Sequence, residues 1–270
     1  MKNRSLSLKE ALRALAEEKE RSGLLLRRFE ADLEQAARIQ KALLPKASPR
    51  LEGFDVSGLN VPCYEIGGDY FDFVPIGDDR IGLVIADVSG KGISASLLMA
   101  SLRAALLAEV YPEYDLQRLT ARLNDFVFKS TGSTDFVTFV FAEIDRRTEE
   151  LRYVNAGHNP PFVLVGGAGM TSLGATGLPL GMFAGSGYEC RTFPFGPGDM
   201  AVLYTDGITD GRSPQGEDYT EDRLKRIVVA NAALPASDIC RMAIDDVGEY
   251  ACGVQPCDDM TIVVVKRAAI

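Results

Sequence analysis

Residues 81–96 place a carboxylate at the end of a strand that should be buried. Residues 81–86 are apolar throughout, which is typical of a strand covered on both faces, and Asp87 follows them just before a turn with Gly90 and Gly92. Burying a lone carboxylate is costly unless a cation or hydrogen bonds compensate its charge. Two interpretations are open at this point: Asp87 and Ser89 cap the helix that follows, or Asp87 binds a metal ion.

Three further acidic turns stand beside predicted strands. Asp69 follows a glycine pair, Asp206 ends an apolar strand and precedes a glycine, and Asp258 and Asp259 precede another apolar run. Any one of them is more typical of a turn than of a ligand, because Asp and Gly are turn residues. Four carboxylate turns at the ends of core strands, without a histidine or thiolate cluster, favour an all-oxygen site for Mg2+ or Mn2+, and such a site can hold two ions.

Length and composition indicate a globular protein. The chain has 270 residues, of which 46% are hydrophobic and 25% charged, enough for one large core or two modest ones. No run reaches the roughly 18 apolar residues of a membrane-spanning helix, and the polar start is unlike a signal peptide, so we expect no membrane segment and a cytoplasmic location. The five scattered cysteines and a single histidine argue against a disulfide framework and a zinc site.

Charge is unevenly distributed along the chain. The first 50 residues carry 12 Lys and Arg against 7 Asp and Glu, whereas the remainder carries 17 against 31. A body with this excess of carboxylates would repel a phosphate backbone, so nucleic acid is not an expected partner. The same excess suits a divalent cation.

Residues 5–44 are predicted to form a helical arm, because they contain no proline, one glycine and apolar residues at helical spacing. Ser22 and Gly23 interrupt the pattern and are expected to divide the arm into two helices, and Pro45 ends it. One apolar lane repeats every seven residues but its partner lane is mixed, which is at most a weak coiled coil. The arm either packs on its own domain, or pairs with a second copy or receives a signal.

From residue 54 onward, strands dominate the pattern. Strands are predicted at 54–61, 70–74, 81–87, 136–144, 151–155, 162–165, 190–193, 200–204 and 260–265, and helices at 92–110, 116–128, 221–230 and 236–250. Three strands, a helical pair and further strands at hairpin spacing indicate an antiparallel α+β fold with segregated helices. The glycine-rich residues 166–187 are either a substrate-facing flap or a long solvated loop.

Five motifs in order carry a resemblance to a known family: GGDYFDF, IADVSGKG, NAGHNPP, LYTDGITD and DDMT. Together they resemble the metal-dependent type 2C (PPM) protein serine/threonine phosphatases, specifically the bacterial SpoIIE/RsbU-like branch, over about residues 37–266. The resemblance implies an αββα sandwich of two antiparallel sheets flanked by helices. It divides the chain into an N-terminal helical arm at 1–45 and a phosphatase domain at 46–270, with two Mn2+ or Mg2+ ions in a cleft at one edge.

Matched to that family residue by residue, five positions would bind the two ions. Asp87 would bridge both, Asp69 and the backbone carbonyl of Val88 would complete one site, and Asp206 and Asp258 would complete the other. Asp259 stays the alternative to Asp258. The implied reaction is hydrolysis of a phosphomonoester by a water that the ions activate, with no covalent enzyme intermediate and no further catalytic residue assigned.

The chain departs from eukaryotic relatives at two places. A histidine that serves them as general acid is replaced by Ser89, whose hydroxyl is too weak an acid at neutral pH, and residues 60–68 lack their phosphate-binding arginine. Lys91 and the amides that open the helix at Gly92 are therefore the candidate phosphate-binding groups. His158 is interpreted as a structural residue beside the core rather than a catalytic one.

Substrate and partners follow from the resemblance alone. In this branch the substrate is a phosphoserine or phosphothreonine on a partner protein, usually a STAS-domain anti-sigma-factor antagonist in a partner-switching pathway, and the arm is a candidate for homodimer contacts. The alternative is a catalytically silent binding module on the same fold, although all four acidic positions are intact. A nucleotidyl cyclase, suggested by the likeness of GGDYFDF to GGDEF, is disfavoured because Tyr70 cannot ligate a metal as the missing glutamate would.

Overall fold

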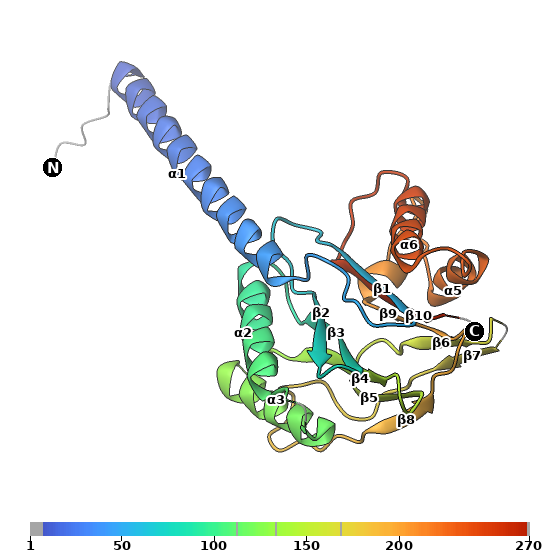
Figure 1. Cartoon of the computed structure of the whole chain (residues 1–270). Coiled ribbons are helices and arrows are strands. Elements are labelled where there is room, and N and C mark those ends of the chain that lie inside the picture. Colours follow the sequence, from blue (N-terminus) through green and yellow to red (C-terminus); the bar gives the residue numbers. More distant parts are fainter. Residues whose placement is uncertain (1–7, 112, 133, 168, 269–270) are drawn as a thin grey trace.

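The computed structural model describes residues 8–268 except 112, 133 and 168, and within them two antiparallel sheets pack face to face (Figure 1). The first sheet has the strand order β1-β10-β9-β6-β7 and the second β2-β3-β4-β5-β8. The strands of the first are β1 (Phe54–Val61), β10 (Met260–Arg267), β9 (Met200–Tyr204), β6 (Phe162–Val165) and β7 (Gly169–Ser172). Those of the second are β2 (Tyr70–Ile76), β3 (Arg80–Val88), β4 (Val137–Asp145), β5 (Glu150–Ala156) and β8 (Arg191–Pro194).

Helices cover the outer face of each sheet, which confirms the predicted αββα sandwich. The helices α2 (Ile93–Glu109) and α3 (Leu116–Ser130) pack on the second sheet, and α5 (Glu221–Ala230) and α6 (Ala236–Ala251) pack on the first. Side chains alternate along β3, so that Val84 and Ala86 face α2 while Leu83 and Ile85 meet the other sheet. Because both faces of β3 are covered, its residues 81–86 are apolar without interruption.

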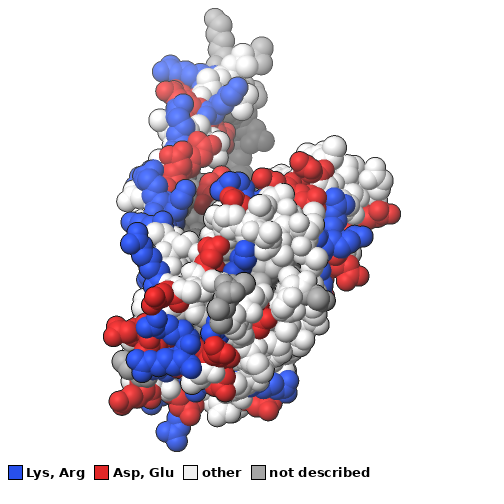
Figure 2. Space-filling model, turned by 45° about the vertical axis from the view of Figure 1, so that its right-hand side comes forward, with Lys and Arg blue, Asp and Glu red and all other residues white. Residues whose placement is uncertain are grey.

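The N-terminal arm is one continuous helix, α1 (Leu8–Leu43), which projects from the sandwich (Figure 1). The expected break at Ser22 and Gly23 is absent, because a single helical glycine costs only about 1 kcal/mol and strong helix formers flank it. Residues 12–22 are exposed throughout, so the arm does not pack on its own domain over this part. Basic and acidic side chains alternate along it (Figure 2). Residues 5–7 of the predicted arm lie outside the described residues.

Residues 166–187 are more ordered than a solvated loop. They contain β7, which pairs with β6, and Leu180 exchanges two backbone hydrogen bonds of 2.9 and 2.8 Å with Val137 at the start of β4. Neither β7 nor the short helix α4 (Asp206–Thr209) was predicted from the sequence. Among the described helices, none combines the length and apolarity that crossing a membrane requires.

Candidate metal centre

Antiparallel pairing brings the four acidic turns to one edge of the sandwich. In the second sheet β2 begins where β3 ends, so Asp69 comes beside Asp87. In the first sheet β10 begins where β9 ends, so the turn with Asp258 comes beside Asp206. The strand pairing therefore gathers the carboxylates that the sequence scatters over some 190 positions.

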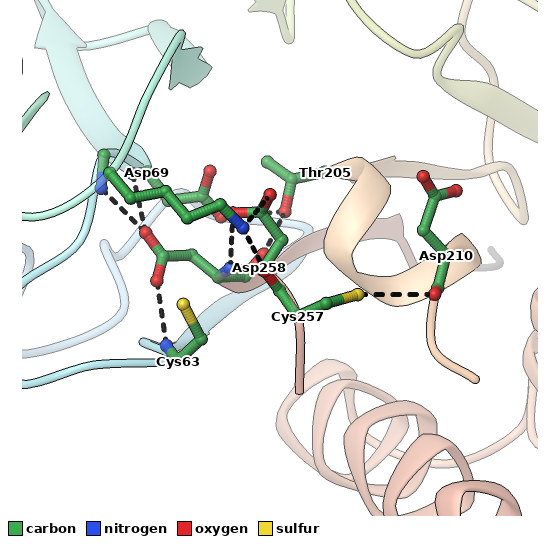
Figure 3. A network of polar contacts seen from close by, with 9 residues as sticks. Cys63, Asp69, Thr205, Asp210, Cys257 and Asp258 are labelled. Atoms are coloured by element: carbon green, nitrogen blue, oxygen red, sulfur yellow. Dashed lines mark hydrogen bonds and ion pairs between the residues drawn. The ribbon is translucent and has the colours of Figure 1, made fainter. Parts of the chain in front are cut away.

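Asp69 is oriented by hydroxyls from the opposite sheet. It is 4% exposed, and its Oδ2 atom accepts hydrogen bonds from the Oγ1 atoms of Thr205 (2.8 Å; Figure 3) and Thr261 (2.5 Å). Burial, and then the charge of Asp87, raise the pKa of Asp69 well above its usual range, although the two threonine hydroxyls act against this. The two threonines thus fix the orientation of the Asp69 carboxylate, and the negative charges of Asp69 and Asp87 repel each other.

Asp259 fastens the loop that carries Asp69. Its Oδ1 atom accepts the backbone amide of Cys63 at 2.8 Å, and its Oδ2 atom accepts those of Gly68 at 2.7 Å and Asp69 at 3.4 Å. A Cβ atom at Gly67 would lie 2.2 Å from the Asp259 Oδ2 atom, so only glycine allows this close approach. Both carboxylate oxygens of Asp259 are thus engaged with backbone amides.

The side chain of Asp258, which precedes Asp259, has different partners. Its Oδ1 atom accepts the amide of Asp259 at 2.9 Å, and its Oδ2 atom lies 2.7 Å from the Lys91 Nζ atom. The side chain is 36% exposed, unlike that of the buried Asp259. Of the two neighbouring acids, Asp258 is the one whose carboxylate is available to an incoming ligand, in the position that the family match assigns to it.

Asp87 and Asp206 belong to the same electrostatic cluster. Burial, followed by the charges of Asp206 and Asp258, raises the pKa of Asp87 to about 7. Burial, followed by the charges of Asp210 and Asp258, also raises the pKa of Asp206. Like charges this close favour protonation unless a cation is bound, so the cluster has the electrostatic character of a cation site.

The donor set fits a hard divalent cation. Gly68 brings its loop against the carbonyl of Val88: a Cβ atom there would lie 3.0 Å from the Val88 oxygen, so glycine allows this close approach. A candidate sulfur ligand is the Cys63 thiol, which lies within 4.8 Å of Asp258 and Asp259 oxygens, whereas the Cys257 thiol is directed at the carbonyl oxygen of Asp210 at 3.7 Å. Burial and Asp259 raise the pKa of the Cys63 thiol to about 11, which disfavours the thiolate form that binds metal ions, so the favoured ligands are oxygens.

The predicted phosphate-binding groups lie next to this cluster. Lys91 ion-pairs with Asp258, and Gly92, with φ of 72°, precedes α2 without a side-chain cap. Ser89 is occupied elsewhere, because its Oγ atom accepts the backbone amide of Phe136 at 2.9 Å. Capping of α2 by Asp87 or Ser89, one of the two interpretations of this turn, is therefore not what the structure contains.

His158 is a buried cross-link, as interpreted from the sequence. Its Nε2 atom lies 3.1 Å from the carbonyl oxygen of Tyr204 and must donate to it, so the Nδ1 atom accepts the Thr138 hydroxyl at 2.7 Å. Burial lowers the pKa of His158 to about 4, and the ring is neutral at physiological pH. It ties β4 to β9 behind the acidic cluster.

Sequence reasoning missed three residues that support the site. Thr205 and Thr261 lie inside the quoted motifs but carried no assigned role, because nothing in the sequence indicates that their hydroxyls reach Asp69. Gln40 near the end of α1 was read only as part of the arm. Its Nε2 atom donates to the carbonyl of Gly67 at 2.7 Å and its Oε1 atom accepts the Gly67 amide at 3.0 Å, so the arm grips the loop that carries Asp69.

Comparison with known proteins gives the family. Residues 77–268 match the family described as Stage II sporulation protein E (SpoIIE). The chain belongs to the SpoIIE family. It is 30% identical to protein IcfG of Synechocystis sp. over 263 residues, covering 87% of this chain and 41% of IcfG. It is 29% identical over 242 residues to the phosphoserine phosphatase RsbU of Bacillus subtilis, covering 88% of this chain and 71% of RsbU.

The fold has a close solved counterpart. The SiaA PP2C domain of Pseudomonas aeruginosa superposes with a TM-score of 0.79 at 20% identity, covering 90% of this chain and 98% of that domain. The chain therefore belongs to the SpoIIE family and has a fold like that of the SiaA PP2C domain, which confirms the family resemblance of the motifs. It spans less than half of the length of IcfG.

Proposed function

We propose that this chain is a divalent-metal-dependent protein phosphatase that hydrolyses phosphoserine or phosphothreonine on a partner protein. The observation that carries the proposal is the convergence of Asp69, Asp87, Asp206 and Asp258 at one sandwich edge, where burial and mutual repulsion raise the pKa values of Asp69, Asp87 and Asp206. Membership of the SpoIIE family and similarity to a protein named phosphoserine phosphatase support the reaction class.

Two Mn2+ or Mg2+ ions are proposed to occupy the cluster. Asp87 would contact both, Asp69 and the Val88 carbonyl would hold one, and Asp206 and Asp258 would hold the other. When bound, such ions lower the pKa of water and offset negative charge on the phosphoryl oxygens. The supporting feature of this chain is the difference between the two neighbouring acids. Both carboxylate oxygens of Asp259 accept backbone amides, whereas the Oδ2 atom of Asp258 pairs with the exposed Lys91 side chain and can bind an ion if that side chain moves.

The chain's own groups would then orient the phosphate. Thr205 and Thr261 hold Asp69, and Lys91 brings a positive charge to the mouth of the cluster. Neither Ser89 nor His158 is suited to protonate the departing alkoxide, because the Ser89 hydroxyl is too weak an acid at neutral pH and the His158 ring is buried and neutral. We expect modest turnover for this reason.

The partner protein is proposed to be a phosphorylated STAS-domain antagonist in a partner-switching pathway. The test is phosphate release from a panel of phosphorylated STAS-domain proteins in Mn2+ and in EDTA. Metal-dependent release from at least one member supports the proposal, and release in EDTA alone contradicts it. Calorimetric titration with Mn2+ separates the alternative, because a silent binding module on this fold should bind the ion weakly or not at all.

The arm is proposed to form a homodimer through α1. Large apolar side chains on this helix are exposed, among them Leu25 at 61%, Leu26 at 60% and Phe29 at 52%. A helix that leaves such residues in water over several turns is stabilised by pairing with a second apolar helix surface.

A further inference from the structure

The side chain of Lys91 links the two sheets at their acidic edge. It leaves a turn in which Gly90 and Gly92 have φ values of 89° and 72°, a conformation that favours glycine, and it belongs to the segment between β3 and α2. Its Nζ atom lies 2.7 Å from the Oδ2 atom of Asp258 and also donates to the carbonyl oxygen of Cys257. Figure 3 shows Asp258 and Cys257 together on the turn before β10.

The ammonium group takes the one Asp258 oxygen that would serve a cation. The other oxygen, Oδ1, already accepts the amide of Asp259 at 2.9 Å. Two positive charges on a single carboxylate oxygen repel each other strongly at these separations. An ion bound there and the Lys91 ammonium therefore compete for the same atom.

Among the proposed ligands, the residue that Lys91 contacts is Asp258. Asp258 is assigned to the ion that Asp87 and Asp206 would also hold, and not to the ion that Asp69 and the Val88 carbonyl would hold. The competition is therefore expected at one of the two ion positions.

We propose that Lys91 is a built-in competitor for the cation held by Asp87, Asp206 and Asp258, and that its ammonium group leaves Asp258 when that cation binds. The inference rests on the proposed metal site. The side chain is 40% exposed and has a flexible four-carbon stem, so it can leave without disturbing the core. Once displaced, the ammonium group stays beside the acidic cluster, where a bound phosphoryl group would bring negative charge.

Calorimetric titration of Mn2+ into three variants tests the competition. Lys91→Met removes the charge but keeps the length, Lys91→Arg keeps the charge, and Lys225→Met removes a lysine that pairs with Glu221 at 2.9 Å on α5. We expect Lys91→Met to tighten the dissociation constant of one of the two ions about tenfold or more. The other ion should be little affected, and both control variants should bind like the wild type.

Unchanged or weaker binding of both ions by Lys91→Met would overturn the competition. If the wild type binds no Mn2+ at all, the proposed metal site is wrong as well, so the two failures are distinguishable without any phosphatase assay. A second measurement follows the lysine itself. Acetylation of Lys91, quantified by peptide mass spectrometry, should become several-fold faster in saturating Mg2+ because the ammonium is released from Asp258. An equal or slower rate in Mg2+ contradicts the proposal.

Discussion

At the residue scale, Asp87 has three acidic neighbours that act on its pKa. Asp206, Asp258 and Asp259 all raise its pKa after burial has done so, and Lys91 lowers it. A carboxylate at the centre of such a group gains most from a cation, because one ion relieves several repulsions together.

We therefore expect Asp87→Ala to lower the affinity for both ions, since the residue is proposed to touch both, whereas loss of Asp69 or Asp258 should mainly affect one. Calorimetric titration with Mn2+ measures this directly. Binding of two ions by Asp87→Ala at near wild-type affinity would remove Asp87 from the bridging position.

His158 makes the fold sensitive to acid. Its pKa of about 4 in the folded protein lies below the ordinary value of 6.5, so the unfolded chain binds more protons between these pH values. The free energy of unfolding should fall as the pH decreases through this window, by as much as about 3 kcal/mol. Asp69, Asp87 and Asp206, whose pKa values are raised, act in the opposite direction in the metal-free protein.

The contribution of the imidazole is isolated by comparing the wild type with His158→Gln in urea unfolding at pH 7 and pH 4.5. The carboxylates are common to both proteins, so the variant should lose less stability on acidification. Equal losses would mean that the imidazole is not held neutral by the fold.

At the element scale, α1 and the loop before β2 form one unit. Gln40 makes two hydrogen bonds with the backbone of Gly67, and Asp69 lies two residues further on. This contact is a direct route from the arm to the acidic cluster.

Gln40→Ala should weaken binding of the Asp69 ion several-fold, because the loop loses one of its fixed points. Gln35→Ala is the matched control, since Gln35 lies on the exposed part of the same helix. Mn2+ affinity and the Mn2+ dependence of the phosphatase rate are the measurements. Equal affinities for Gln40→Ala and Gln35→Ala would show that the arm does not act on the site through this contact.

The double variant Leu26→Asp/Phe29→Asp tests the arm as a dimer contact. Burying one or two such side chains contributes about 1.5–3 kcal/mol each, comparable with the roughly 2.7 kcal/mol that moves a two-state equilibrium from 1:99 to even. We expect light scattering to report a dimer for the wild type and a monomer for the variant, with a weaker Mn2+ response. A monomer with an unaltered metal dependence and maximal rate would leave the arm as a tether.

Most elements could be predicted from local pattern, and the exceptions have physical causes. The strand of residues 81–87 was visible because both of its faces are buried. β7 was not predicted, because Gly169–Ser172 is exposed and lacks an alternating apolar pattern, so that its pairing with β6 cannot be inferred locally. The break at Gly23 was expected from propensity alone, which a long helix of strong formers overrides.

The acids of the site could be found because they sit out of pattern at strand ends, whereas their supports could not. Thr205, Thr261 and Gln40 are ordinary residues in sequence, and their roles depend on contacts between segments far apart in the chain. The family resemblance favoured Asp258 over Asp259, and only the backbone contacts of Asp259 give a physical reason for that choice. Assignment of the ligands stays a prediction until ions are measured.

At the scale of the whole molecule, the two sheets are joined at their acidic edge by contacts that serve the site. Asp69, at the edge of one sheet, accepts hydrogen bonds from hydroxyls of the other, and Asp259 accepts a hydrogen bond from the Gly68 amide in the loop before β2. The sandwich is therefore arranged so that metal binding would draw both halves together. Carboxylates that repel each other in the ion's absence are the cost of that arrangement.

The measurement that tests this account most directly is Mn2+-dependent hydrolysis of p-nitrophenyl phosphate by the wild type and Asp206→Asn. Asp206 opens α4 at the end of a fully buried strand, where its ionised form depends on a cation. We predict activity that requires Mn2+ in the wild type and is abolished in Asp206→Asn, with circular dichroism unchanged and a melting temperature in EDTA no lower than that of the wild type. Retention of more than about a tenth of the wild-type activity, equivalent to a loss of less than about 1.4 kcal/mol in transition-state stabilisation, would contradict it.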